Sequence, residues 1–289
     1  MSTYGEPIDV TETDNSFRPT LAALLRDRAG VVAAGFLLLL VVIALLGPIV
    51  YDKDPAKQHL LEGMESPSLS HPLGTDDLGR DMAARMIAGT RITLAAVAIA
   101  LGVACAVGLI PALVSGYLGG RIDGFIMRCT DFLISLPPLI LAIAVIGAIG
   151  QGLRNTMIVV GLIMAPNLLR VIRSSVVNVR NEAYMDAARL IGCSHTRILR
   201  RHVLRNVLPT IIVMINLIAA QALLAEAGLS FIGLGVVPPQ ASWGALLKDG
   251  VPNLGTAPIL IIAPGLAISL TVLSLNLVGD TLRRASRSW

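Results

Sequence analysis

The residue types that most often do chemistry in proteins occur in this sequence without the spacing that such chemistry needs. None of the three lysines, Lys53, Lys57 and Lys248, follows a glycine, which excludes the Gly-Lys phosphate loop of ATP-hydrolysing proteins. The histidines form no H-x-x-x-H pair for zinc, and no serine lies in a Gly-x-Ser-x-Gly elbow. We therefore predict that the chain is not an enzyme and holds no catalytic residue, metal or cofactor of its own.

A basic loop, residues 174–206, carries a pattern suited to recognition. Helical spacing places Ala183, Ala187 and Leu190 on one face, and acidic residues favour the N-terminal end of such a helix. Gly192 then allows the chain to turn. The segment is either a solvated connector or a short helix that docks in a groove of another protein. The docking hypothesis rests on Glu182, Asp186, Ala187, Ala188, Gly192 and His202.

The polar groups inside the long apolar segments are few and uncharged. The middle of each segment lacks Asp, Glu, Lys, Arg and His, which argues against a proton-coupled carrier and a voltage sensor because both need ionisable residues there. Amides in such segments either bond to a neighbouring helix or line a pore. The candidate pore-lining residues are Asn167, Asn216, Gln221 and Asn276.

The composition identifies the solvent around these segments. Of the 289 residues, 54% are hydrophobic and only 15% are charged, whereas about a quarter of a soluble domain is charged. This deficit of charge excludes a soluble enzyme and a disordered chain. The formal net charge of +4 therefore bears on membrane orientation and does not indicate a nucleic-acid partner.

Six apolar segments are long enough to be read as membrane spans. The sequence therefore predicts an all-α polytopic membrane protein with six transmembrane helices. Small residues recur every fourth position in the second span, at Ala96, Ala100, Ala104 and Gly108, and would pack closely on another helix of this chain or of a second subunit. The predicted spans are residues 31–50, 92–117, 125–150, 155–169, 207–225 and 257–279.

Both termini are predicted to be cytoplasmic, because that arrangement places most lysine and arginine residues on the inner side. A cytoplasmic tail is expected at 1–30 and a second one at 281–289. Between them the prediction gives a first helix at 31–50, an extracytoplasmic segment at 51–91 and a five-helix core at 92–280 that contains the loop 174–206.

The extracytoplasmic segment is predicted to contain an amphipathic helix on the outer surface. Thr75 can cap it, and Leu78 and Met82 share one face. This helix would either cover the mouth of the spans or contact another protein outside the membrane. The candidate contact residues are Asp77, Arg80, Asp81 and Arg85. In the third span, Arg128 and Asp131 are expected to form a local ion pair.

Four motifs occur in order along the chain. One motif resembles the E-A-A loop of permease subunits in bacterial ABC importers. It consists of Asp186-Ala-Ala, Gly192 and the basic run that ends in His202-Val-Leu. The other motifs narrow the resemblance to C-type permeases of the dipeptide, oligopeptide and nickel importers. They are His71-Pro-Leu-Gly-Thr-Asp-Asp-Leu-Gly-Arg-Asp81, Glu226-Ala-Gly-Leu-Ser-Phe-Ile-Gly-Leu-Gly235 with Pro238-Pro239 and Ser242-Trp243-Gly244, and Leu275-Asn-Leu-Val-Gly-Asp280.

The resemblance implies a type I importer architecture in the bacterial plasma (inner) membrane. It implies a second homologous permease, two cytoplasmic ABC ATPase subunits that bind ATP and Mg, an extracytoplasmic substrate-binding protein and surrounding membrane lipid. The loop around Asp186 would couple ATP hydrolysis to the spans. Two positions depart from the pattern: Asp186 replaces a usual Glu, and Arg205 replaces a usual Pro, which bears on how the chain enters the fifth span.

The function expected from this resemblance is half of a translocation path for di- or oligopeptides. A nickel chelate or another small solute fits the sparse polar interior as well. A stand-alone channel or carrier and a scaffold without a path are further alternatives. The exact substrate and the pairing with an identical or a different permease stay open at this point.

Overall fold

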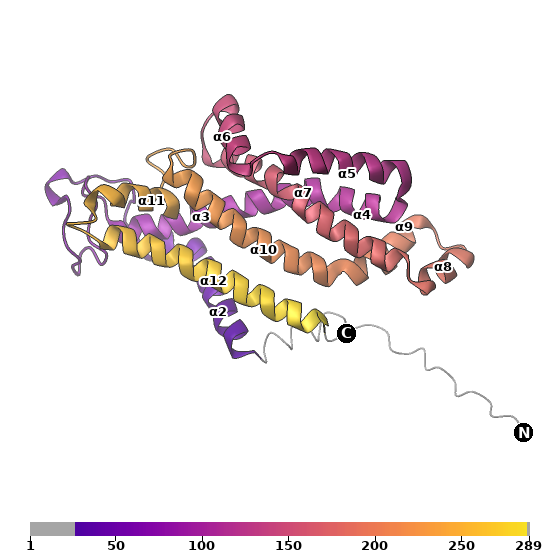
Figure 1. The fold of residues 1–289 in the computed structure, drawn as a ribbon. Coiled ribbons are helices and arrows are strands. Elements are labelled where there is room, and N and C mark those ends of the chain that lie inside the picture. Colours follow the sequence, from indigo (N-terminus) through magenta and orange to yellow (C-terminus); the bar gives the residue numbers. More distant parts are fainter. Residues whose placement is uncertain (1–26, 288–289) are drawn as a thin grey trace, which may run out of the picture.

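The computed structural model describes residues 27–287, and the chain is helical through most of that range (Figure 1). Polar and Gly-Pro-rich connections separate the helices, and the apolar runs form the long ones. The helices of eight or more residues are α2 (Arg28–Val50), α3 (Met82–Ala104), α4 (Ile110–Leu118), α5 (Gly120–Ser135), α6 (Pro138–Ile149), α7 (Leu153–Arg180), α8 (Ala183–Leu190), α10 (Leu204–Phe231), α11 (Trp243–Gly250) and α12 (Ile259–Arg287).

Two π-helical segments join shorter helices into continuous rods. The segment η2 (Cys105–Leu109) connects α3 to α4, and the segment η3 (Ile198–Val203) connects the short helix α9 (His195–Arg197) to α10. Within residues 27–287, five helices or rods are long and apolar enough to cross a membrane: Arg28–Val50, Met82–Leu118, Leu153–Arg180, His195–Phe231 and Ile259–Arg284. The prediction of an all-α protein with several spans is confirmed, and the sixth span depends on α5 and α6.

The third predicted span, residues 125–150, is not one straight helix. The helices α5 and α6 meet at an angle of 90°, and in Figure 1 α6 stands out from the other helices. Leu136 has an extended backbone, with φ −86° and ψ 134°, as expected for a residue before proline. Pro137 and Pro138 therefore break the helix, and the predicted third span is a pair of helices bent at these two prolines.

The second predicted span is longer than expected, because it includes the predicted surface helix. The rod begins at Met82, and the carboxylate of Asp81 caps it by accepting a hydrogen bond from the amide of Ala84 at 2.9 Å. Thr75 does not cap a helix: its hydroxyl donates to the carbonyl of Glu62 and accepts from the amide of Glu65. The prediction of a separate amphipathic helix capped by Thr75 was therefore wrong.

The small-residue stripe of the second span packs within this chain. Ala96, Ala100 and Ala104 are completely buried. A Cβ atom added to Gly108 would lie 2.7 Å from the carbonyl oxygen of Ala165 on α7. The rods α3–α4 and α7 therefore approach each other backbone to backbone, which is how helices gain packing energy in lipid. Packing within the chain, one of the two readings of this stripe, is confirmed.

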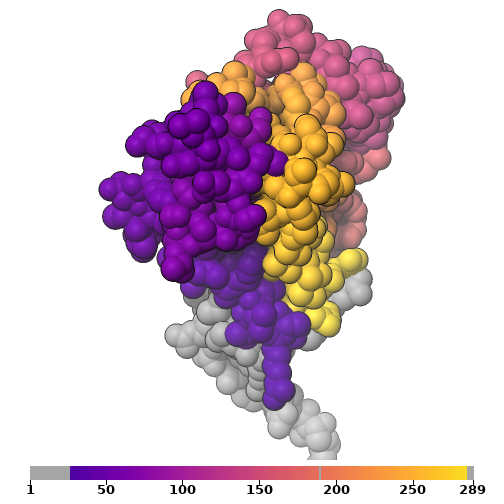
Figure 2. Space-filling model, turned by 90° about the vertical axis from the view of Figure 1, so that its left-hand side faces the viewer, coloured from indigo at the N-terminus to yellow at the C-terminus, as the bar shows by residue number. Residues whose placement is uncertain are grey.

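The candidate coupling residues and the candidate binding-protein contacts lie at the two ends of this bundle. The outer segment, residues 51–81, lies at one end together with α11, and α8 lies at the opposite end (Figure 1). Figure 2 shows the outer segment as a thick layer beside α11 and the start of α12. We name the two ends of the bundle by their helices, as the α11 end and the α8 end.

Candidate functional site

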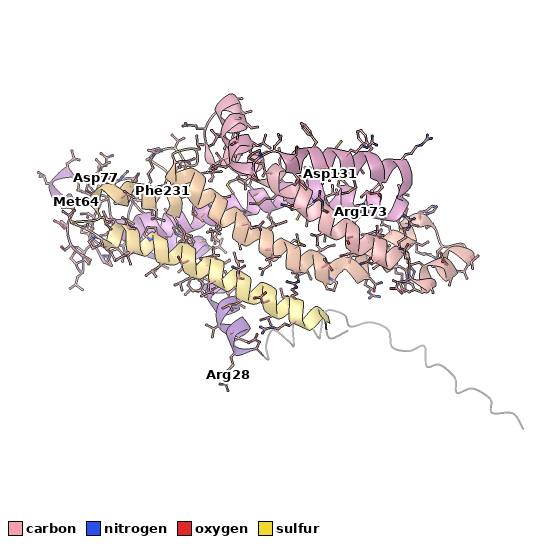
Figure 3. All side chains as sticks on the ribbon, in the orientation of Figure 1. Arg28, Met64, Asp77, Asp131, Arg173 and Phe231 are labelled. Atoms are coloured by element: carbon pink, nitrogen blue, oxygen red, sulfur yellow. The ribbon has the colours of Figure 1, made fainter. Side chains whose placement is uncertain are left out.

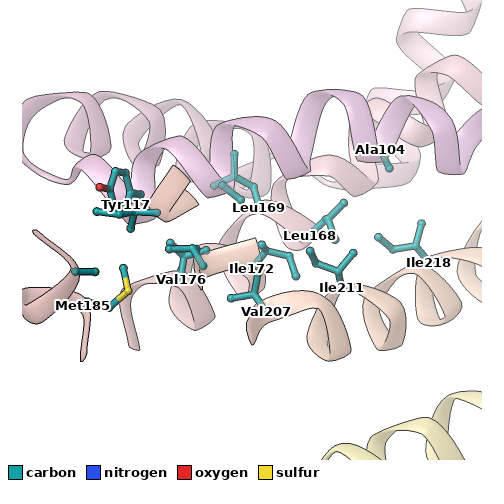
Figure 4. Close-up of a cluster of buried hydrophobic side chains, with 14 residues drawn as sticks. Ala104, Tyr117, Leu168, Leu169, Ile172, Val176, Met185, Val207, Ile211 and Ile218 are labelled. Carbon is teal, nitrogen blue, oxygen red and sulfur yellow. The ribbon is translucent and has the colours of Figure 1, made fainter. Parts of the chain in front are cut away.

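The helix α8 projects from the bundle but is anchored to it by two side chains. Met185 is completely buried and Ala188 nearly so, in a cluster that includes Tyr117 of α4 and Val176 of α7. Figure 4 shows Met185, Tyr117 and Val176 together at one end of that cluster. The helix is therefore held by one face, and its position depends on the packing of the spans beneath it.

The opposite face of α8 is exposed. Leu190 has a relative exposure of 88% and Ile191 of 79%, while Ala183 and Ala187 are exposed as well. Of the alanine pair, Ala187 therefore faces outwards and Ala188 faces the bundle. An exposed apolar face on a short helix outside the spans is typical of a protein contact surface.

Gly192 ends the helix in a conformation that favours glycine, with φ +77°. The next helix starts at once: the side chain of Ser194 caps α9 by accepting from the amide of Arg197. The chain outside the long helices is thus shorter than the predicted loop 174–206, because α7 continues to Arg180 and the rod of α10 begins at His195.

Of the remaining loop residues, Asp186 lies within α8, and Glu182 and His202 lie before and after it in the chain. Glu182 and Asp186 are exposed. The ring of His202 lies against that of Tyr184, with centroids 6.3 Å apart, and the amide nitrogen of Asn206 donates to the Tyr184 hydroxyl at 3.1 Å. Partial burial, together with the charge of Glu182, raises the pKa of Tyr184. Its hydroxyl therefore stays protonated at neutral pH.

Sequence reasoning missed the residues on either side of α8 that bind α4. The Tyr117 hydroxyl and Nδ1 of His195 form a 2.8 Å hydrogen bond, and the guanidinium of Arg180 donates to the carbonyls of Gly116 and Tyr117. These residues lie on either side of the recognisable motif, so the motif does not indicate them. The Gly119-Gly120 pair next to Tyr117 was the available signal of an unusual turn.

The four candidate pore residues occupy different surroundings. The amide of Asn216 donates to the carbonyl of Leu275, so it joins α10 to α12. Asn167, Gln221 and Asn276 are exposed on the single chain. Polar amides that face lipid are unfavourable, so these three positions point to a surface covered by something other than acyl chains.

A hollow of about 300 Å³ lies between α6, α7 and α10. It is lined by Ile163 and Met164 of α7 and by Leu224 and Ala225 of α10, among others. Asn167 is one helical turn from the first pair, and Gln221 is one turn from the second, both towards the α8 end. The hollow and these two amides therefore follow one face of the α7–α10 pair.

At the α11 end, the predicted contact residues are largely internal. Asp76 is buried and accepts hydrogen bonds from Arg80 and Arg85, and Arg85 also pairs with Asp249 of α11 at 3.1 Å. The side chain of Asp77, by contrast, is 56% exposed (Figure 3). Of Asp77, Arg80, Asp81 and Arg85, the structure thus leaves Asp77 accessible and uses the other three to hold the outer segment.

Asp81 is the centre of a second group of polar contacts at the α11 end. One of its carboxylate oxygens accepts from Tyr51 at 2.9 Å and lies 2.9 Å from the ammonium of Lys53 and 2.8 Å from Nδ1 of His71. Burial opposes the charged form, but the amide of Ala84 and the three side chains outweigh it and lower the pKa of Asp81 below its ordinary value. Asp81 therefore remains ionised at neutral pH.

The predicted ion pair between Arg128 and Asp131 is replaced by pairs between helices. Asp131 of α5 binds Arg170 of α7 at 2.6 Å, and Asp123 binds Arg173 at 2.5 Å (Figure 3). The expectation of a local pair was wrong because α7 runs alongside α5 and presents two arginines to it.

Comparison with known proteins agrees with this geometry. Residues 104–288 match the family described as binding-protein-dependent transport system inner membrane component, and residues 17–67 match the N-terminal TM domain of oligopeptide transport permease C. The chain is 37% identical to the glutathione transport system permease protein GsiD of Pectobacterium atrosepticum, over 90% of this chain and 87% of that one. It is 36% identical to the nickel transport system permease protein NikC of Escherichia coli K12, over 85% and 91%.

A solved structure of the MetNI methionine ABC transporter, in an inward-facing conformation, superposes with a TM-score of 0.58. The match covers 71% of this chain and 97% of the MetNI chain at 18% sequence identity, so it supports the fold. Motif order, helical architecture and sequence identity agree, and the expected family is confirmed. The chain therefore belongs to the multi-pass inner-membrane permease components of binding-protein-dependent ABC importers, in the branch that contains the peptide and nickel permeases.

Proposed function

We propose that this permease forms one membrane half of an importer for di- or oligopeptides. In this arrangement an external binding protein delivers the solute at the α11 end and two ATPase subunits bind at the α8 end, which is cytoplasmic. The observation that carries the proposal is α8, which is anchored by Met185 and Ala188 and exposes Leu190 and Ile191 outside the spans. ATP and Mg would bind to the ATPase subunits.

The coupling residues proposed here are Glu182, Asp186, Ala187, Ala188, Gly192 and His202. A helix fixed to the bundle by one face and exposed on the other can move with a partner and shift the spans between two arrangements. Gly192 gives the chain the sharp return that keeps α8 and the rod of α10 as separate bodies. The exposed Ala187 permits close approach of the partner's backbone.

The solute path is proposed to run past the hollow between α6, α7 and α10, with Asn167 and Gln221 as its polar residues. Asn216 then contributes to helix packing, and Asn276 is exposed on the surface of α12. A second homologous permease would cover the hollow and complete the path. Amides suit peptides because they can bond a peptide backbone with little selection among its side chains.

The peptide class is favoured by a relative named for glutathione, which is itself a small peptide. A relative of nearly equal identity is named for nickel, so a nickel chelate is the second candidate solute. At the α11 end we propose that Asp77 takes part in contact with the binding protein. Arg80, Asp81 and Arg85 would position the outer segment that carries it.

The test is reconstitution of the permease with its ATPase subunits, second permease and binding protein in liposomes. We expect ATP-dependent uptake of a labelled di- or oligopeptide, and stimulation of ATP hydrolysis by the loaded binding protein. Uptake of a nickel chelate without peptide uptake would select the second candidate. Solute flux through this chain alone without ATP would contradict the importer.

A further inference from the structure

The short segment that contains α8 is flanked by two residues that bind the same turn of another span. Arg180 is the last residue of α7 before α8, and His195 is the first helical residue after it. Arg180 donates to the carbonyls of Gly116 and Tyr117 at 3.4 and 3.3 Å, and His195 is hydrogen-bonded to the Tyr117 hydroxyl at 2.8 Å. Both ends of the α8 segment are therefore attached to the end of α4.

The turn at the end of α4 is shaped for these contacts. A Cβ atom on Gly116 would lie 2.8 Å from Cβ of Val176 and 3.0 Å from the carbonyl oxygen of Arg173. Gly119 has φ +69°, and a Cβ there would lie 2.5 Å from the Arg180 guanidinium. Larger residues would push α4 away from α7 and displace Arg180. The contact thus depends on close approach as well as on hydrogen bonds.

The two ring systems reinforce the attachment. Tyr117 and His195 also meet edge to face, with centroids 5.8 Å apart. Tyr117 is buried, and it belongs to the same cluster as Met185 of α8. A displacement of α8 therefore acts on α4 through a hydrogen bond, a ring contact, the Arg180 guanidinium and the shared packing.

The span that would move with α8 contains an irregular helical segment. The rod Met82–Leu118 carries the π segment Cys105–Leu109 between α3 and α4. π segments interrupt the regular hydrogen-bond ladder of a helix and often occur at functional sites. The α4 end can therefore change its angle relative to α3, whereas α7 is regular through its length except for Pro166.

We infer that Tyr117, Arg180 and His195 form a clamp that transmits movement of α8 directly to the α3–α4 span. By covalent connection alone, α8 would move α7 and α10, and α4 would follow only through packing. The clamp adds a direct route, with Tyr117 and Arg180 as positioning residues. This inference rests on the proposed function, because it needs ATPase subunits that move α8.

The experiment uses the complete importer with Tyr117→Phe, His195→Phe and the double variant. Each single change removes the same hydrogen bond and keeps an aromatic ring in place. We expect the ratio of solute-stimulated to basal ATP hydrolysis, and the solute transported per ATP, to fall about three- to tenfold in each single variant. The double variant should be no worse than either one, because only one bond is lost.

A matched control is Tyr51→Phe, which removes a tyrosine hydrogen bond to Asp81 at the α11 end. It should leave transport per ATP at the wild-type value. A second positive arm is the exchange Tyr117→His with His195→Tyr, which restores a hydrogen-bonding pair and should recover part of the ratio. Arg180→Gln should lower the ratio in the same direction as Tyr117→Phe.

The outcomes separate the two proposals. A wild-type complex in which loaded binding protein does not stimulate ATP hydrolysis would contradict the proposed function itself. A wild-type complex that is stimulated, together with an unchanged ratio in both single variants, would overturn the clamp. Additive losses in the double variant, or an equal loss in Tyr51→Phe, would also overturn it, since they would indicate general destabilisation.

Discussion

The two ends of the molecule use charged and apolar side chains in opposite ways. At the α11 end, the buried carboxylate of Asp76 binds the buried side chains of Arg80 and Arg85. At the α8 end, the helix keeps apolar Leu190 and Ile191 exposed and places Glu182 and Asp186 beside them. Charge can therefore serve internal architecture outside the membrane, and an apolar surface can serve assembly. In the sequence the two segments look alike, as short amphipathic helices with acidic starts.

Removal of the Asp76 carboxylate should cause the largest loss of stability at either end. Asp76→Ala leaves Arg80 and Arg85 buried without their shared carboxylate, which we expect to cost about 3–5 kcal/mol of stability. Thermal unfolding of the purified complex should show a large fall in Tm. Asp77→Ala, one residue away and exposed, is the control and should change Tm little. Equal effects of the two changes would contradict the buried network.

Charge placed on the α8 face should act on assembly and not on folding. Leu190→Asp with Ile191→Asp should weaken association with ATPase subunits at least about tenfold, because two exposed apolar contacts become charged. Co-purification from detergent measures this. The control is Leu61→Asp, a fully exposed leucine in the outer segment, which should retain the ATPase subunits. Retention in both variants would show that α8 is a connector.

The pH dependence of the two ends should differ. The pKa of Asp81 is lowered in the folded protein, so its stabilising contribution is present above the pKa of an unfolded aspartate and is lost as pH falls through the lowered folded value. Hydrogen exchange followed as the pH is lowered from about 6 should show the outer segment protected until the pH falls below the usual pKa of an aspartate, and loosened beneath it. Asp81→Asn should remove the part of this dependence that belongs to residue 81. Unchanged pH dependence in that variant would exclude Asp81 as its source.

The smallest effect is expected for the exposed pair between Asp131 and Arg170. Both side chains are half exposed, and such pairs contribute less than about 1 kcal/mol. Asp131→Asn should therefore shift Tm only slightly. Asp123→Asn is the matched comparison, because its bidentate partner Arg173 is more buried. A larger effect at Asp131 would show that exposure does not rank these pairs.

Sequence reasoning predicted the features that depend on local patterns. The apolar runs indicated the spans, and the spacing of Ala183, Ala187 and Leu190 indicated the exposed face of α8. It also predicted the turn at Gly192. These inferences succeed because helical periodicity and glycine conformation depend on few neighbours.

It was wrong where distant segments decide the outcome. Asp76 accepts from two arginines whose placement depends on α11, and Asp131 binds a helix 39 residues further along the chain. The same holds for Tyr117, which meets His195 across the α8 segment. The break between α5 and α6 was different, since Pro137 and Pro138 were visible, but prolines in membrane helices more often bend a span than divide it.

That division affects the thickness of the membrane barrier. A helix of 16 residues such as α5 is about 24 Å long, and the 12 residues of α6 reach about 18 Å. Neither half can cross roughly 30 Å of hydrocarbon alone. A solitary copy would therefore leave a thin place in the bilayer beside these helices. In the assembly proposed above, a second permease beside these helices would keep the membrane tight to ions as well as complete the passage.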